Sequence, residues 1–143
     1  MTTERTRETM NAYVEALLSS GDFARYLADD VTVAFMGTDR TVHGRDAARQ
    51  LITFVHEIAF RTDIEIKTLV CEGSSAAIEA EFVGTHIGEF EGIPASNRDV
   101  RLPYTAAYDL EDGRITSLRL YFPLDALLLQ IGAGQQARAM ATA

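Results

Sequence analysis

The sequence has only one cysteine, Cys71, so it can form neither an internal disulfide nor a metal site built from several cysteines. It also has no apolar run of about 18 residues, the length that a membrane-spanning helix needs. The polar start MTTERTRETMN lacks the hydrophobic segment of a signal peptide. We therefore expect a protein of the reducing cytoplasm that does not associate with membranes.

Basic residues are scarce as well. The chain has 13 lysines and arginines against 21 aspartates and glutamates, and its formal net charge is -8. Nucleic acids and anionic membrane surfaces bind basic patches, so neither is expected as a partner. The sequence has no Walker loop and no dinucleotide fingerprint, and its three histidines lack partners at the spacing of a metal site. We expect neither a metal nor an organic cofactor.

Periodic apolar patterns cover most of the chain. Apolar residues recur at helical spacing over residues 4–20 and 46–59, and each stretch predicts a helix with one buried stripe. Five stretches predict strands: 31–36, 63–71, 76–88, 99–110 and 114–122. A helical turn is expected at 23–28, a tight turn at 111–113, and a last helix that follows Pro123 and ends at Gly132.

Helices that precede a mostly antiparallel run of strands favour the α+β class, with the helices laid on the concave face of a curved sheet. Residues 1–132 are expected to form one domain, since 143 residues in total suit a single core. Residues 133–143 contain few large apolar side chains, and we expect them to form a flexible tail.

The last strand alternates in polarity. Leu118, Leu120 and Phe122 share one face, whereas Arg119 and Tyr121 share the other. We expect the apolar face to lie on the concave side of the curved sheet and to line a pocket there. Hairpin pairing then turns Tyr104, Ala106 and Tyr108 of the preceding strand inward, and Arg119 and Tyr121 lie on the outer face, where they suit a subunit contact.

Four motifs carry a resemblance to a known family: HGRDAA (43–48), GTHIGEFEGIP (84–94), EDGRIT (111–116) and YFPLDALLLQIG (121–132). Together they resemble the SnoaL-like, polyketide cyclase-like group of the NTF2-like superfamily. RLPY (101–104) is also similar to the limonene-epoxide hydrolase branch. The resemblance implies a cone-shaped fold and pairing of two subunits through the outer sheet face. The activities that it implies are isomerisation, cyclisation and epoxide opening.

The sequence departs from this group at two polar positions. The group's cyclases and epoxide hydrolases use an aspartate on the last strand, and the matching position is Leu120. The preceding strand often carries a polar pocket residue in these cyclases, and the matching position is Ala106. Neither catalytic set is therefore carried over intact.

Three other side chains are candidates for the chemistry. The Tyr104 phenol could donate to a developing oxyanion, His86 could act as a general base, and Glu81 could replace the missing acid. Each has a structural alternative: a core tyrosine with a satisfied hydroxyl, a histidine that shapes the loop after its strand, and a glutamate that faces water beside Glu79. The expected substrate-binding residues are Tyr13, Phe35, Tyr108, Leu118, Leu120 and Phe122.

These features lead to a hypothesis of function. The protein is expected to be a homodimeric, cofactor-independent isomerase, cyclase or epoxide hydrolase that acts by proton transfer on a small hydrophobic, oxygenated molecule. One alternative is a non-catalytic protein that binds an apolar small molecule in the same pocket. A third is a structural dimer whose cavity is filled by side chains. The residues that converge in the cavity distinguish these cases.

Overall fold

The computed structural model describes residues 1–132, so the flexible tail expected at 133–143 lies outside the described residues. In chain order the elements are α1 (Thr3–Leu18), η1 (Phe23–Tyr26), β1 (Leu27–Phe35), β2 (Thr41–His43), α2 (Arg45–Thr53), η2 (Phe54–Ala59), β3 (Phe60–Thr62), β4 (Glu65–Glu72), β5 (Ser75–His86), β6 (Asp99–Glu111), β7 (Arg114–Tyr121) and α3 (Leu124–Ile131). The segment η1 is a short 3-10 turn, and η2 is a wider π-helical segment that continues α2.

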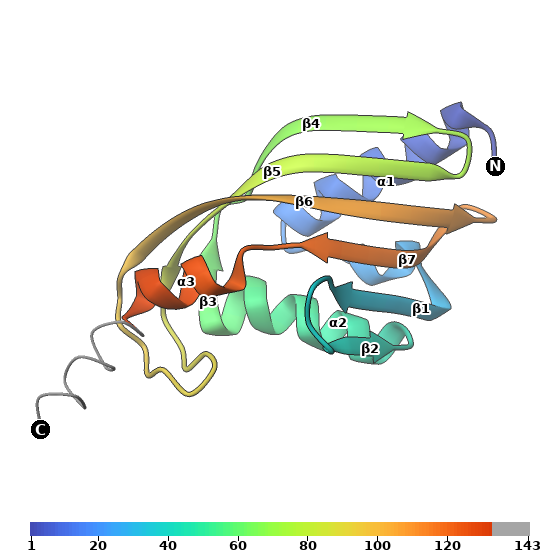
Figure 1. Ribbon diagram of the computed structural model, residues 1–143. Coiled ribbons are helices and arrows are strands. Elements are labelled where there is room, and N and C mark those ends of the chain that lie inside the picture. The colour runs from blue at the N-terminus through green and yellow to red at the C-terminus, as the bar shows by residue number, and fades with distance from the viewer. Residues whose placement is uncertain (133–143) are drawn as a thin grey trace, which may run out of the picture.

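The strands form one strongly curved sheet (Figure 1). Its order is β2-β1-β7-β6-β5-β3, and β4 pairs with β5 as well. The β1–β7 pair is parallel, and the other pairs are antiparallel. In Figure 1, α1 and α2 lie behind the strands, on the concave side of the sheet. The expected α+β cone with helices over its concave face is confirmed.

Irregular pairing helps to bend the sheet. The register shifts between Leu27 and Thr32 in β1, between Ile66 and Thr68 in β4, and between Asp109 and Leu110 in β6. Such bulges increase the local twist and curvature of a strand. Residues three positions apart in a regular strand face opposite sides of the sheet. The register shift in the β6–β7 hairpin explains why Ile115 and Leu118 are nevertheless both buried.

Two short strands and two boundaries differ from the sequence prediction. Strands β2 and β3 were not predicted, because three residues are too few to show an alternating pattern. Strand β1 begins already at Leu27, directly after η1. The helix predicted over 46–59 is α-helical only to Thr53 and then widens into η2.

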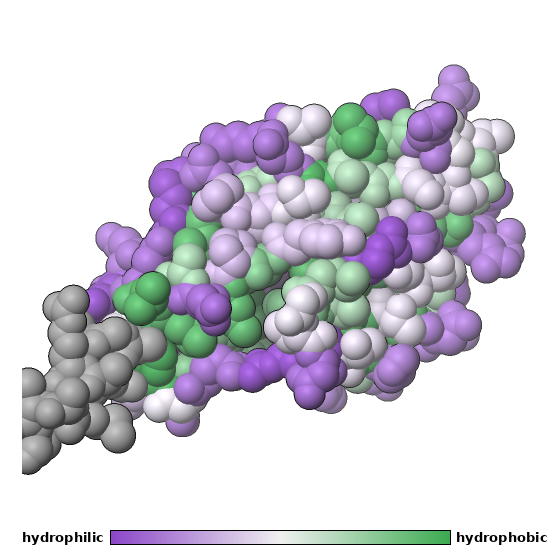
Figure 2. Space-filling view, in the orientation of Figure 1, coloured by the Kyte–Doolittle hydropathy of each residue, from purple (hydrophilic) through white to green (hydrophobic). Residues whose placement is uncertain are grey.

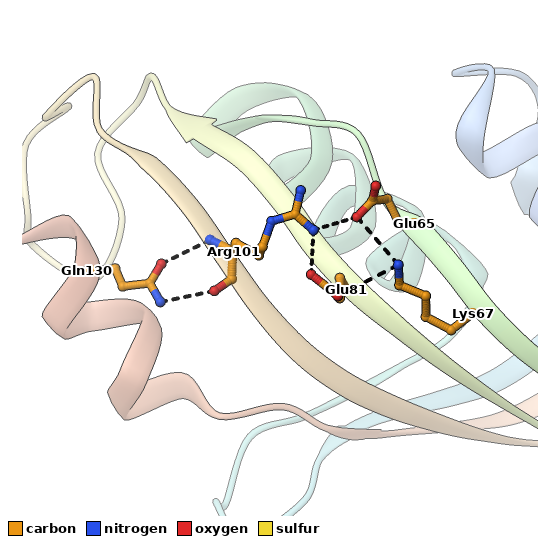
Figure 3. A network of polar contacts seen from close by, with 5 residues as sticks. All are labelled: Glu65, Lys67, Glu81, Arg101 and Gln130. Atoms are coloured by element: carbon orange, nitrogen blue, oxygen red, sulfur yellow. Dashed lines mark hydrogen bonds and ion pairs between the residues drawn. The ribbon is translucent and has the colours of Figure 1, made fainter.

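Helix α3 covers a strand edge that β7 leaves free. Pairing between β6 and β7 stops at Thr105, so the earlier part of β6 has no strand neighbour on that side. The side-chain amide of Gln130 forms the two backbone hydrogen bonds with Arg101 that a neighbouring strand would otherwise form. Its Oε1 accepts from the Arg101 N–H at 3.0 Å, and its Nε2 donates to the Arg101 carbonyl at 3.1 Å (Figure 3). This contact ties α3 to the end of the cone.

The contact between the two parallel strands gives a first prediction. Ile115 of β7 is fully buried and pairs with Leu27 of β1, which is also fully buried. Replacement Ile115→Ala should lower the free energy of unfolding by about 2–5 kcal/mol, because it opens a cavity in the core. Urea denaturation measures this change. Ile58→Ala is the matched control, since Ile58 is 56% exposed. Similar losses in both variants would contradict the assigned core.

Candidate functional site

A small apolar cavity of about 70 Å³ lies between the concave face of the sheet and the helical segments α2, η2 and α3. Four residues expected in the pocket line it: Phe35, Tyr104, Leu120 and Phe122. Leu120 lies beside Ala106 in the β6–β7 ladder, so the two positions at which the resemblance implies polar residues are neighbours and are both apolar here. The wall exposes only carbon atoms to the cavity.

A second, larger pocket adjoins the cavity, and we call it the vestibule. Its volume is about 360 Å³, and it shares six wall residues with the cavity: Val33, Phe35, Leu51, Val55, Phe90 and Leu124. Its other side is polar and includes Asp39, Arg40 and Glu91. Arg40 and Glu91 form a two-pronged ion pair across this polar side.

Three other residues expected to bind substrate do not line the cavity. Tyr13 and Tyr108 are almost fully buried and pack edge to face with ring centroids 6.0 Å apart, and Leu118 is also buried in the core. Burial, together with the neighbouring phenols, raises the pKa of both tyrosines far above the usual value. Burial raises the pKa of Tyr104 to about 12. All three phenols therefore stay protonated at neutral pH and remain hydrogen-bond donors.

His86 is fully buried at the end of β5, but it does not reach the cavity. Its Nδ1 accepts a hydrogen bond from the Ser96 N–H at 3.1 Å and lies 2.9 Å from the Ser96 hydroxyl. Its ring packs against Phe60 at 5.2 Å. Burial lowers the pKa of His86, and the Gly88 backbone acts in the opposite direction. The residue thus anchors the loop between β5 and β6, and the structure favours this alternative over a general base.

Glu81 lies on the outer face of the sheet, contrary to the expectation of a cavity-facing carboxylate. Figure 3 shows it between Arg101 and Lys67, and Arg101 Nη1 also contacts Glu65 at 2.6 Å. The hydrogen bond from Arg101 is the main cause that lowers the pKa of Glu81. Odd-numbered residues of β5 face outward at this point, so Glu79 shares that face and accepts from the Thr68 hydroxyl. Glu81 cannot supply an acid inside the cone.

His56 is the titratable residue of the cavity wall that the sequence reasoning missed. Its Nδ1 donates to the Ile52 carbonyl at 2.8 Å, so the neutral ring carries its proton there and Nε2 has a free lone pair. Burial is the main cause that lowers its pKa, against smaller opposite effects of Ile52 and Glu57. The signal was present in the sequence: Ile52, His56 and Ala59 follow the helical spacing of the buried stripe.

The His56 ring stands between two compartments. It borders the apolar cavity, and it also borders a polar groove of about 430 Å³ on the helical side that includes Arg49, Glu57 and Arg61. Within residues 1–132, Nε2 has no hydrogen-bond partner. His56 lies in the π-helical segment η2, and π-helical segments occur frequently at functional sites.

Two kinds of site are absent from the described part of the chain. Over residues 1–132, no three side chains of His, Cys, Asp or Glu come together as metal ligands would. None of the helices in this range is long and apolar enough to cross a membrane.

The two buried histidines give a prediction for the pH dependence of stability. The pKa of His56 and that of His86 are both lowered from 6.5. The unfolded chain therefore takes up protons at a higher pH than the folded chain, and stability must fall as the pH drops below about 6.5. Urea denaturation at about pH 7.5 and at about pH 5.5 measures this loss.

His56→Asn should show a smaller loss of stability over this pH range than the wild type, because one of the two groups is gone. Asparagine keeps a donor near the position of Nδ1, so the bond to Ile52 can persist. His43→Asn is the control, since His43 is exposed. The same pH dependence in His56→Asn and in His43→Asn would contradict the burial of an unprotonated His56. Protonation of Glu81 and Glu91 does not contribute to this difference, because their pKa values are lowered from 4.5 and they take up protons only at lower pH.

Comparison with solved structures shows the same fold in several proteins. A protein from Jannaschia sp. CCS1 assigned as a SnoaL-like polyketide cyclase has a TM-score of 0.81 at 21% identity, over 90% of this chain and 92% of that one. An LEH-like epoxide hydrolase of M. tuberculosis has a TM-score of 0.70 at 18% identity, over 97% and 98%. A protein from Kribbella flavida assigned as a ketosteroid isomerase has a TM-score of 0.65 at 22% identity, over 85% and 79%. At these identities the likeness shows the fold alone.

The sequence comparisons give the family. No curated protein matches the chain at a significant level. The sequence profile of the SnoaL-like polyketide cyclases, in contrast, matches residues 7–131, which is most of the chain. The cone-shaped fold of the solved structures agrees with this match. The chain therefore belongs to the SnoaL-like polyketide cyclase family.

Proposed function

We propose that this protein binds a small, mainly apolar, oxygenated molecule in the cavity and vestibule and catalyses a proton transfer on it, as an isomerase or cyclase without a cofactor. The observation that carries the proposal is the pair His56 and Tyr104, two titratable side chains in an otherwise hydrocarbon wall. Their pKa shifts suit opposite roles, a neutral base and a protonated donor.

The proposed reaction starts at a carbon next to a carbonyl group. Nε2 of His56 takes the proton, the C–H electrons form the carbon–carbon double bond of an enolate, and the charge moves to the oxygen. The Tyr104 hydroxyl donates a hydrogen bond to this oxygen. In an isomerisation a second double bond next to the reacting carbon extends the enolate, and the proton returns from His56 to the far carbon of that double bond. In a cyclisation the enolate carbon attacks a second carbonyl group, whose oxygen then takes the proton.

Epoxide opening is the least supported of the expected reactions. It needs a carboxylate that orients a water molecule, and no carboxylate lines the cavity among the described residues. Asp39 and Glu91 lie on the polar side of the vestibule, and Glu91 is paired with Arg40.

A second candidate function is a non-catalytic binding protein for an apolar small molecule. Two specific observations favour it: the position of the family's acid is Leu120, and the cavity wall exposes only carbon atoms in the ligand-free protein. A catalyst would have to bring Nε2 of His56 and the Tyr104 hydroxyl to the ligand on binding, whereas a carrier would need no such movement.

Exchange of hydrogen for deuterium in β-tetralone, a small hydrophobic ketone, distinguishes the two functions. The wild-type protein in deuterium oxide should accelerate loss of the protons next to the carbonyl group, followed by proton NMR. His56→Asn should lower the protein-dependent rate by about 100-fold or more, since general bases contribute at least that much. Tyr104→Phe should lower it by a smaller factor, because it removes one hydrogen bond to the enolate.

Glu81→Gln is the matched control and should keep the wild-type rate, since Glu81 faces outward. Binding of β-tetralone is measured in parallel by calorimetry. Binding without any protein-dependent exchange would refute the enzyme and leave the carrier. Exchange that survives in His56→Asn would show that another group acts as the base.

We also propose that two copies pair through the outer face of the sheet. Four small apolar residues and one arginine form a row across it in the ladder: Val70, Ala77, Ala107, Arg119 and Ala34. Tyr121 on the same face is 50% exposed, and Met36 nearby is 39% exposed. Figure 2, which views the face with the strands in front, shows a pale area of this kind bordered by hydrophilic residues. Arg119 donates to Asp109 at 2.7 Å, so its charge is already compensated.

Sedimentation velocity tests this dimer. The wild type should sediment as a dimer, and Tyr121→Glu should shift it to the monomer because it places a charge on the outer face, where Tyr121 is exposed. Ile58→Glu should have no effect, since Ile58 is exposed on η2 rather than on the sheet. A monomeric wild type, or equal effects of both variants, would refute the contact.

A further inference from the structure

The short hairpin formed by residues 90–93 closes one side of the cavity. Phe90 lines both the cavity and the vestibule, so its ring forms part of the partition between them. It stacks on Phe54 at 6.4 Å and packs edge to face against Phe60 at 5.3 Å. Since the cavity alone measures about 70 Å³ and the vestibule about 360 Å³, a ligand of ordinary size needs both spaces and must displace this ring.

The hairpin has an unusual residue at its tip. Phe90 and Ile93 exchange backbone hydrogen bonds of 3.0 and 2.9 Å, and Glu91 and Gly92 form the two-residue turn. Both turn residues have positive φ, +52° at Glu91 and +77° at Gly92. Asparagine, aspartate or glycine normally occupies the first position of such a turn, and glutamate pays a steric cost there. A strained residue of this kind calls for a compensating contact.

Arg40 supplies that contact from the opposite side of the vestibule. The two terminal nitrogens of its guanidinium donate to the two oxygens of the Glu91 carboxylate, and Arg40 lies in the turn between β1 and β2. Over residues 89–95, this ion pair is the one polar bond that joins the hairpin tip to the rest of the described chain. The side chains of Arg40 and Glu91 are 50% and 25% exposed, so water and salt can weaken the pair.

The ends of the loop, in contrast, are held firmly. The N–H groups of Ile87 and Gly88 donate to the Ala59 carbonyl at 2.9 and 3.0 Å, and the Asn97 N–H donates to the His86 carbonyl at 2.9 Å. A side chain at Gly88 would clash with the Ile58 carbonyl at 2.4 Å, so the chain is fixed closely against η2 there. The tip is held by this exposed ion pair and by the packing of Phe90 and Ile93, and it can open between its two fixed ends without unfolding the sheet.

From these contacts we infer that residues 90–93 form a lid, that the Arg40–Glu91 pair is its latch, and that release of the latch merges the cavity and the vestibule to admit the ligand. The inference depends on the proposed function in that it assumes a ligand in these two spaces. It adds the route of access and the pair of residues that controls the rate of binding.

Two measurements test the latch, and the first needs no ligand. Glu91→Gln and Arg40→Met break the ion pair and keep the side-chain shapes. Both should speed hydrogen exchange of the Phe90 and Ile93 amides by about two- to five-fold, because the free energy that an exposed ion pair contributes corresponds to a factor of this size. Glu91→Asn should also speed this exchange, because it removes the ion pair, although asparagine fits the positive φ of the turn better than glutamate does. Glu65→Gln, which removes a partner of Arg101 on the outer face, should leave these amides unchanged.

The second measurement follows uptake of the neutral probe N-phenyl-α-naphthylamine by stopped-flow fluorescence. Its association rate should rise by about two- to five-fold in Glu91→Gln and Arg40→Met, and the double exchange Arg40→Glu with Glu91→Arg should restore the slow rate. Added salt should speed uptake by the wild type and have little effect on Glu91→Gln.

The outcomes separate the two proposals. Amide exchange at Phe90 and Ile93 that does not change in Glu91→Gln and Arg40→Met refutes the latch, whatever the probe does. Faster amide exchange with no probe binding in any variant refutes the cavity as a ligand site and overturns the proposed function together with the access route. Probe binding at one common rate in all variants refutes the latch and leaves the proposed function intact.

Discussion

The register of β7 between two neighbours determines what the cone can contain. Parallel pairing with β1 and antiparallel pairing with β6 fix which side chains of β7 face inward. A slip of one residue would turn Arg119 and Tyr121 into the core and expose Leu118 and Leu120 to water. The buried leucines therefore give this register its stability. One of them, Leu120, occupies the position at which the resemblance implies an acid.

We propose that a residue of the helical side, His56, compensates for that loss. His56 enters the cavity wall from η2, and Tyr104 enters it from β6, so the two residues come from opposite layers of the fold. Each is partly buried, and this burial shifts the pKa values in the direction that keeps both groups neutral. A neutral base and a neutral donor can be stored in a hydrocarbon environment at far less cost than an ion pair.

The sequence was sufficient for the fold and for half of the site. The alternation of polarity along the strands placed Phe35, Tyr104, Leu120 and Phe122 on the inner face, because successive side chains of a strand point to opposite faces of the sheet. It could not place Tyr108 and Leu118, which also face inward but lie beyond the cavity, since depth along the cone depends on packing. His86 and Glu81 do not reach the cavity, for different reasons. A hydrogen bond with a neighbouring serine holds the histidine, and the position of the glutamate in its strand turns it to the outer face. His56 lay on a recognised stripe but was weighed only as a metal ligand.

The wider turn of η2 has a consequence for how this chain can vary. A π-helical turn holds about one residue more than an α-helical turn, so the deletion of one residue upstream of His56 would restore a regular helix. The residues that follow the turn would keep their phase, because the wider turn absorbs one residue, and only the residues inside it, His56 among them, would turn relative to the cavity. The imidazole would then turn away from its present place in the cavity wall. The length of this segment is thus coupled to the chemistry of the wall, and a shortened homologue would have to place its base elsewhere.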